Sequence, residues 1–393
     1  METDSVFYIG TREEEKGQSM FIKNLVSDFV CTLRGVCIPA LFFLSLLVLS
    51  CGGGGSGTDN SGGGVPLDVI VDQSGNGDYT RIQQAVRDAV PGSVITVRAG
   101  TYNENIVFSR SGTAELPITL KNYPDEMPVI IPGTGFAQRV ELNAEHIIVE
   151  GFEIKGGYDG IKIYKSNNVV RNNYVHNNKF TGILIAATTS EISNVLVDNN
   201  IVESNGFEPD TGDPYPDLSL KNIHGIYISD FACVGTSDIT ISNNTITGHG
   251  GRAIQWNGQD CGTKMRSTIV EGNLIEDNSW GMALFYNVEG ASITNNVFIS
   301  DSRPETNDTF WTFFGIWGSE NNVISGNSFD STLPDMTALI VVDEQSTHNT
   351  VDDNTWRLAG DMWIWEGVER TDWTSYPEIT GWDLNGDICL DCI

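Results

Sequence analysis

The segments DGIKI (Asp159–Ile163), TGILI (Thr181–Ile185) and HGIYI (His224–Ile228) are three copies of one short strand. In each copy two isoleucines flank one variable residue. Side chains alternate across a β-strand, so the two isoleucines of a copy share a face and the variable residue points to the other face. Four later segments continue the series: RAIQW (Arg252–Trp256), WGMAL (Trp280–Leu284), FGIW (Phe314–Trp317) and TALIV (Thr337–Val341).

A second strand type, which ends in an asparagine turn, lies between these copies. VVRNNYV (Val169–Val175) and ITISNNTI (Ile239–Ile246) are two examples. Short strands and turns that recur at intervals of about 20–50 residues are the signature of a solenoid. The pattern predicts an all-β protein, a parallel β-helix, in which each coil stacks on the next. The turn anchors are Asn173, Asn200, Asn244, Asn273, Asn296, Asn327 and Asn354.

We interpret these asparagines as structural. Asparagine tolerates left-handed backbone dihedrals and can bond its own backbone. Stacked asparagine side chains can also form amide ladders inside a turn. Function is therefore expected on the outer face of the coils or in their loops.

The chain is strongly acidic, with 22 Lys and Arg against 52 Asp and Glu among 393 residues, a net charge of −30. Such a surface repels polyanions, so nucleic acid is not an expected partner. An acidic polysaccharide remains compatible, because a local basic cleft or a bound cation can override the mean field.

The amino-terminal 50 residues are interpreted as a lipoprotein-type signal peptide, with Met20 as the better start. An apolar run (Gly35–Ser50) is too short for a comfortable membrane span and precedes Cys51. VLSC (Val48–Cys51) resembles a bacterial lipobox, which makes Cys51 the expected lipidation site. Residues 51–64 read as a Gly/Ser tether. We therefore expect a lipid-anchored protein at the outer membrane or cell surface.

Four further cysteines remain after the signal segment and Cys51 are set aside. In an exported protein they are expected to form two disulfides, and a zinc site is the alternative. They are Cys233, Cys261, Cys389 and Cys392.

The two ends of the solenoid are expected to be capped. Gly77–Val90 has helical spacing, with Ile82, Ala85, Val86 and Ala89 on one face, and predicts a helix over the open amino-terminal end. We expect the β-helix to span residues 65–355 and a Trp-rich tail, residues 356–393, to cover the other end.

The segment after this helix carries a family resemblance. PGSVITVRAGTYNENIVF (Pro91–Phe108) resembles the first coil of right-handed parallel β-helices of the pectate-lyase-like superfamily. With LPITLKN (Leu116–Asn122) it is especially similar to chondroitinase B and alginate lyases. The resemblance implies a right-handed coil, and this fold carries lyases, epimerases, hydrolases and binding proteins. His224–Ser300 is also similar to bacterial β-helix repeat proteins.

Two adjacent copies of the strand hold the richest set of polar residues. Alternation places Tyr227 and Gln255 outward in one column, with Lys162 two coils below. It places Ser229 and Asn257 in the next column, with Tyr164 below. The candidate catalytic residues are His224, Tyr227 and Arg252, and the candidate substrate-binding residues are Lys162, Tyr164, Gln255, Asn257, Asp260 and Lys264.

The leading hypothesis is recognition and cleavage of an extracellular acidic polysaccharide by β-elimination, by a protein expected to be monomeric. Arg252, Gln255 or Asn257, alone or with calcium, would neutralise the uronate carboxylate. His224 or Tyr227 would remove the proton or protect the leaving oxygen. The alternatives are purely structural roles, in which His224 fixes a turn and Arg252 pairs with an aspartate.

Other functions stay open. A non-catalytic glycan-binding or surface-adhesion protein would use the same face, and a uronate epimerase is a further possibility. A glycoside hydrolase needs two carboxylates, for which Asp230 with Asp260, or Asp210 with Asp213, are candidates. Calcium is also a candidate ligand near the carboxyl terminus, where oxygen-bearing side chains alternate at Asp383, Asn385 and Asp387.

Overall fold

The computed structural model describes the chain from Val65 onward, with gaps. The expected signal peptide, Cys51 and the tether lie outside the described residues. Within the described part, no helix is long and apolar enough to cross a membrane. The described ranges are 65–131, 139–208, 223–258, 261–278, 280–302, 312–334, 337–341, 346–359, 362–365, 368–370 and 387–390.

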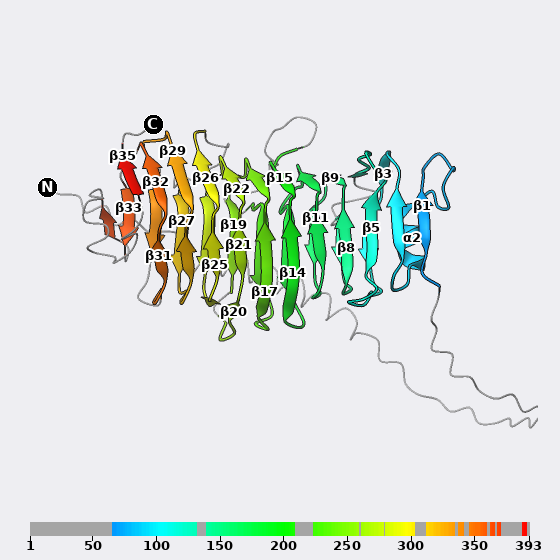
Figure 1. Ribbon diagram of the computed structural model, residues 1–393, viewed down its shortest axis with the longest axis horizontal. Helices are drawn as coiled ribbons and strands as arrows, with labels where there is room; N and C mark the ends of the chain where they lie inside the picture. The colour runs from blue at the N-terminus through cyan, green and yellow to red at the C-terminus, as the bar shows by residue number, and fades with distance from the viewer. Residues whose placement is uncertain are drawn as a thin grey trace, which may run out of the picture. The chain divides into compact units, whose positions relative to one another are not determined.

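The described strands form three sheets, here named A, B and C, and strands of successive coils lie side by side in each (Figure 1). The chain passes from sheet C to A to B and back to C once per coil. This confirms the right-handed parallel β-helix.

Sheet A has a main path and two short side strands. The side strands are β20 (Met265–Arg266) and β24 (Val288–Glu289). The main path is β1 (Asp68–Val71), β2 (Val94–Val97), β5 (Ile118–Asn122), β8 (Ile147–Glu150), β11 (Val169–Arg171), β14 (Ile192–Asp198), β17 (Thr236–Ser242), β21 (Ile269–Glu271), β25 (Ser292–Thr294), β28 (Val323–Ser325) and β31 (Thr350–Asp352).

Sheet B contains the seven strands that follow the asparagine anchors, together with four others. They are β3 (Thr101–Asn103), β6 (Val129–Ile131), β9 (Glu153–Lys155), β12 (Tyr174–His176), β15 (Ile201–Glu203), β18 (Thr245–Thr247), β22 (Leu274–Glu276), β26 (Val297–Ser300), β29 (Ser328–Ser331), β32 (Thr355–Leu358) and β35 (Asp387–Leu390).

Sheet C contains the seven strands recognised in the sequence. Its members are β4 (Ile106–Phe108), β7 (Val140–Leu142), β10 (Ile161–Ile163), β13 (Ile183–Ala187), β16 (Ile226–Asp230), β19 (Arg252–Asn257), β23 (Trp280–Phe285), β27 (Thr312–Trp317), β30 (Thr337–Val341), β33 (Met362–Trp365) and β34 (Val368–Arg370).

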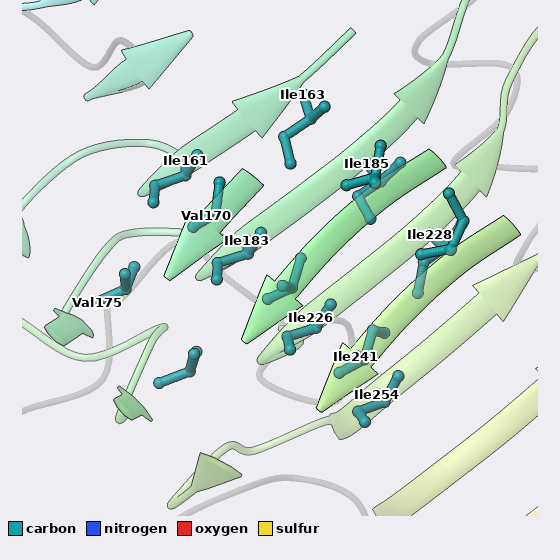
Figure 2. Packing of buried hydrophobic residues seen from close by; sticks show 14 of the residues in the cluster. Ile161, Ile163, Val170, Val175, Ile183, Ile185, Ile226, Ile228, Ile241 and Ile254 are labelled. Atoms are coloured by element: carbon teal, nitrogen blue, oxygen red, sulfur yellow. The ribbon is translucent and has the colours of Figure 1, made fainter. Parts of the chain in front are cut away.

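The core is a set of aliphatic columns that run through the coils. Ile183, Ile226 and Ile254 lie one behind another on successive sheet C strands, as Figure 2 shows, and all three are fully buried. Opposing columns from sheets A and B fill the space between them. Burying each such side chain contributes about 1.5–3 kcal/mol, so the alternating pattern determines which face points inward.

The asparagine ladder at the turn from sheet A to sheet B is confirmed. Each anchor donates from Nδ2 to Oδ1 of the anchor in the next coil, as in Asn173 to Asn200 at 3.1 Å and Asn244 to Asn273 at 3.0 Å. The anchors do not take the left-handed conformation, which corrects our expectation. That conformation belongs to the preceding residue, for example Asn172 (φ 57°) and Asn243 (φ 56°). The anchor side chain can therefore stay inside the turn.

A second ladder, at the turn from sheet B to sheet C, was not anticipated. It contains Asn178, Asn205, His249 and Asn278. Nδ2 of Asn205 lies 3.1 Å from Nε2 of His249, and Nδ1 of His249 lies 2.9 Å from Oδ1 of Asn278. The imidazole thus replaces one amide of the stack. The irregular sequence around these residues gave no repeat signal.

The amino-terminal helix α2 (Ile82–Asp88) caps the coil stack as expected, with Ile82, Ala85 and Val86 buried. The Glu104 carboxylate accepts hydrogen bonds from the backbone N–H groups of Ile82 and Gln83, each at 3.0 Å. A cap from a different coil therefore fastens the helix to the solenoid.

The carboxyl-terminal boundary differs from the expected one. β33 adds a parallel strand to sheet C and β35 adds one to sheet B, beyond residue 355. β34 then pairs with β33 in the antiparallel direction. The tryptophan-rich composition concealed these strands because it lacks the aliphatic alternation of the earlier coils.

Candidate functional site

The outer face of sheet C brings together most of the residues singled out in the sequence. The register pairs Tyr227 with Gln255 and Ser229 with Asn257, as the alternation predicted. Lys162 pairs with Leu184, which pairs with Tyr227, so these residues form one column. Adjacent coils are about 4.8 Å apart, so side chains of neighbouring strands can contact one ligand.

A second column runs along the edge where the chain enters sheet C. His224 precedes β16 by the same offset as Thr181 precedes β13, and Arg252 pairs with Trp280. Asp159 occupies the corresponding place before β10, and its Oδ1 accepts the Thr181 N–H at 3.2 Å. Asp159 was missed as a site residue, although it heads the DGIKI copy in the position that His224 holds in HGIYI.

The column of Lys162, Leu184, Tyr227 and Gln255 is partly exposed to solvent at Lys162 and buried at its other positions. Lys162 is 17% exposed, whereas Leu184, Tyr227 and Gln255 are 3%, 6% and 1% exposed. Outward direction was predicted correctly, but outward does not mean solvent-exposed here. Lys162 is therefore the most exposed of these four positions.

His224 is an uncharged hydrogen-bond donor. Its Nδ1 accepts the backbone N–H of Arg252 at 3.2 Å, so a neutral ring carries its proton on Nε2. Burial, followed by the positive charge of Arg252, lowers the pKa of His224 well below its usual value of 6.5. Nδ1 of His224 thus fixes the turn, and its Nε2–H is a separate hydrogen-bond donor.

Arg252 and two tryptophans form a stack across three coils. The Arg252 guanidinium carbon lies 4.6 Å from the centre of the Trp280 ring, and Trp280 stacks on Trp317 with ring centres 5.5 Å apart. A cation held over an aromatic face keeps its charge and a fixed orientation. The stack therefore fixes the position of the Arg252 guanidinium at this edge of sheet C.

Tyr227 lies beside both groups. Its ring centre is 4.9 Å from that of His224, and its hydroxyl accepts a hydrogen bond from Nδ2 of Asn257 at 3.1 Å. On its other side Tyr227 packs with Leu184 and Phe231 in a small apolar cluster on the outside of the sheet. Phe231 is a neighbour that sequence reasoning did not select.

Two buried polar atoms on this face have no hydrogen-bond partner in the described structure: Oε1 of Gln255 and Oγ of Ser229. Buried polar groups in folded proteins are nearly always satisfied, and such exceptions concentrate at functional positions. Both atoms lie buried beneath the surface of this face.

Two of the candidates lie apart from this face or are bonded elsewhere, and three lie outside the described residues. Lys264 precedes β20 of sheet A and bonds Glu320 at 2.5 Å. Asp230 is fully buried and accepts hydrogen bonds from the N–H groups of Val234 and Gly235 and from the Thr263 hydroxyl, so it caps a loop. Asp260, Asp210 and Asp213 lie outside the described residues.

Cys233 and Cys261 form a disulfide that joins the loops after β16 and β19, which is one of the two expected bridges. Cys389 lies on β35, and Cys392 lies outside the described residues. The calcium candidates Asp383 and Asn385 are also outside, and Asp387 begins β35. Among the described residues, no group of three or more His, Cys, Asp or Glu could hold a metal ion.

The comparisons with known proteins agree with the β-helix fold. Residues 72–209 match the family model described as "Pel9A-like, right handed beta helix region". Residues 72–209 therefore resemble a region of this family, which supports a right-handed coil. This β-helix is 26% identical over 298 residues to a pectate lyase L of Paenibacillus polymyxa (strain SC2), with 65% of each chain covered.

Other similar proteins have different names. A cell surface glycoprotein of Methanothermus fervidus is 24% identical, with 64% of the β-helix chain and 46% of that protein covered. The chain thus spans just under two thirds of the pectate lyase and less than half of the glycoprotein.

Two solved structures share the fold. An alginate lyase from Paenibacillus sp. str. FPU-7 has a TM-score of 0.58 at 18% identity, covering 72% of this chain and 95% of that chain. The GH136 lacto-N-biosidase from Eubacterium ramulus has a TM-score of 0.56 at 14% identity, covering 79% and 64%. At these identities the likeness concerns the fold alone.

Proposed function

We propose that this β-helix binds an extracellular acidic polysaccharide on the outer face of sheet C and cleaves it by β-elimination. The observation that carries the proposal is the grouping of Arg252, Tyr227 and His224 on adjacent coils. The similarity to a pectate lyase supports the same chemistry. Both the substrate class and the reaction are proposals for this chain.

The reaction requires a balanced proton transfer. The C5–H and C4–O4 bonds of a uronate break, a C4=C5 double bond forms, and O4 leaves with a proton. Arg252 would neutralise the carboxylate so that the C5 proton becomes more acidic. The proton then moves through an adjacent side chain to the leaving oxygen.

Tyr227 is the better proton carrier of the two candidates. Its oxygen accepts a hydrogen bond from Asn257, which stabilises the phenolate that removes the C5 proton. The resulting phenol returns that proton to O4. His224 has its Nδ1 occupied by the Arg252 N–H and would instead donate from Nε2 to a sugar oxygen. Gln255 and Ser229 would bind sugar hydroxyls.

The test is turnover on defined polymers. The protein is incubated with alginate, pectate, chondroitin sulfate and dermatan sulfate, with calcium or with a chelator, and the ultraviolet absorbance of unsaturated uronate is followed. We expect the absorbance to rise with at least one polymer and the rise to be lost in Tyr227→Phe and Arg252→Gln. Arg171→Gln is a matched control, because Arg171 pairs with Glu150 on sheet A.

Each other outcome selects an alternative. Binding without any cleavage would favour the glycan-binding or adhesion role. New reducing ends without absorbance would indicate hydrolysis. Loss of turnover in the presence of the chelator would support a role for calcium in neutralising the uronate carboxylate.

Lipid anchoring at the cell surface remains part of the proposal. The lipobox-like sequence before Cys51 supports it. Mass spectrometry of the amino-terminal peptide of the mature protein tests it, and an unmodified Cys51 would contradict it.

A further inference from the structure

An aromatic pair lies beside sheet C, in the turns that lead into β10 and β13. The rings of Tyr158 and Phe180 stack with centres 5.5 Å apart and planes 20° apart. The Phe180 N–H donates to the Tyr158 carbonyl oxygen at 2.6 Å, which ties the two turns together. Phe180 also packs on buried Phe207 and Ile223.

This pair is both rigid and accessible. Phe180 is held from behind, and Tyr158 remains 37% exposed. An exposed aromatic ring held in a fixed orientation suits the apolar face of a sugar ring, because little conformational entropy is lost on binding. The pair also lies at the Lys162 end of sheet C, and Lys162 is the most exposed residue of its column.

The charges beside the pair do not favour an anion. Lys162 Nζ lies 3.8 Å from Oδ2 of Asp159, the residue after Tyr158, and Glu141 pairs with Lys162 in the neighbouring coil. Burial acts to lower the pKa of Lys162, but Asp159 and other neighbours outweigh it and raise the pKa, so the ammonium persists. Two carboxylates therefore offset the one ammonium, and this end of the face carries no net positive charge.

We propose that Tyr158, Phe180 and Lys162 form a separate subsite that binds an uncharged sugar ring. This inference rests on the proposed polysaccharide-binding function of sheet C. The Lys162 position is two coils, roughly 10 Å, from Tyr227 along the same column. The substrate is then a mixed polymer in which a neutral sugar lies near the uronate that Arg252 holds.

Binding measurements on paired variants test the subsite. Isothermal titration compares cellohexaose, mannohexaose and xylohexaose with a galacturonate hexamer, on the native chain, Tyr158→Ala and Arg252→Gln. We expect Tyr158→Ala to weaken the neutral hexamer about tenfold, the loss of one good stacking contact. Arg252→Gln should weaken only the galacturonate hexamer. Tyr158→Phe keeps the ring and should retain the affinity.

Tyr123→Ala is the matched control, because Tyr123 packs under Arg98 next to β5 of sheet A. The subsite is overturned if Tyr158→Ala binds the neutral hexamers as tightly as the native chain does. It is also overturned if the native chain binds galacturonate but no neutral hexamer. Either result leaves the proposed function intact. Neutral binding through Tyr158 without galacturonate binding or uronate turnover supports the subsite and removes the proposed function. Binding of neither class overturns both.

Discussion

At the scale of single residues, two adjacent asparagines in the same turn have different structural roles. In the pair Asn243–Asn244, the first takes the left-handed backbone conformation on the surface and the second is buried in the ladder. Glycine occupies the first place in two other coils, at Gly272 and Gly326, and never replaces an anchor of this ladder in the described coils.

Replacement of a ladder asparagine should be costly. Asn244→Leu removes the bonds of Asn244 to Val197 and Asn273 and leaves the Asn200 N–H without its acceptor. We expect the free energy of unfolding to fall by about 2–4 kcal/mol, since each orphaned buried group costs about 1–3 kcal/mol. Urea denaturation measures it. Asn243→Gly is the control and should change stability by less than about 1 kcal/mol.

Acid should destabilise the protein through His249. Burial lowers the pKa of His249 from 6.5 to about 4 in the folded state. Between these values the unfolded chain binds a proton that the folded chain does not, so stability falls as the pH falls from 6.5 to about 4. The loss amounts to about 3 kcal/mol, an order-of-magnitude figure from 1.36 kcal/mol per pKa unit.

His249→Asn would convert this rung to the amide that the rest of the ladder uses. The urea midpoints of this variant at neutral and at acidic pH should then lie closer together than those of the native chain do. Asn243→Gly, a change at an exposed residue that does not titrate, is the control and should leave the pH dependence unchanged. An equal pH dependence in His249→Asn and the native chain would contradict this account.

At the scale of elements, the cap helix α2 is held by a side chain from elsewhere in the chain. Glu104 is 6% exposed and satisfies two N–H groups at the helix start. The helix has seven residues, which is too short to be stable by itself. Its presence therefore depends on this contact and on its buried face.

We expect Glu104→Ala to cost about 2 kcal/mol, the upper end for loss of a helix cap. Thermal unfolding followed by circular dichroism measures the change. Exposed Glu115→Gln provides a charge-matched control. A melting temperature that is the same in Glu104→Ala and the native chain would show that packing alone holds the helix.

The sequence allowed the strands of sheet C, the Asn173–Asn354 ladder and the outward columns to be predicted. Each depends on a short-range period that the core enforces. It did not reveal the cover over Tyr227 and Gln255, the ladder role of His249, or the place of Asp159. These features depend on contacts between residues of different coils. Because the coils differ in length, such residues are not separated by a constant number of positions in the sequence.

At the scale of the whole molecule, the net charge of −30 opposes an acidic polymer even if Arg252 binds it locally. Salt screens this long-range repulsion over a Debye length of about 10 Å at moderate ionic strength. If the proposed function holds, association with a uronate polymer should accelerate as salt is first added. Stopped-flow binding measures the rate, and a steady decrease with salt would contradict the prediction.

The ladder bonds span chain intervals that differ almost twofold. The bond from Asn200 to Asn244 crosses 44 residues and that from Asn273 to Asn296 crosses 23, yet their lengths are 3.0 and 2.9 Å. The scaffold is thus indifferent to how much chain connects two rungs. Loops on this protein can be lengthened, exchanged or grafted as cassettes, and a new recognition surface can be installed without rebuilding the part that makes it stable.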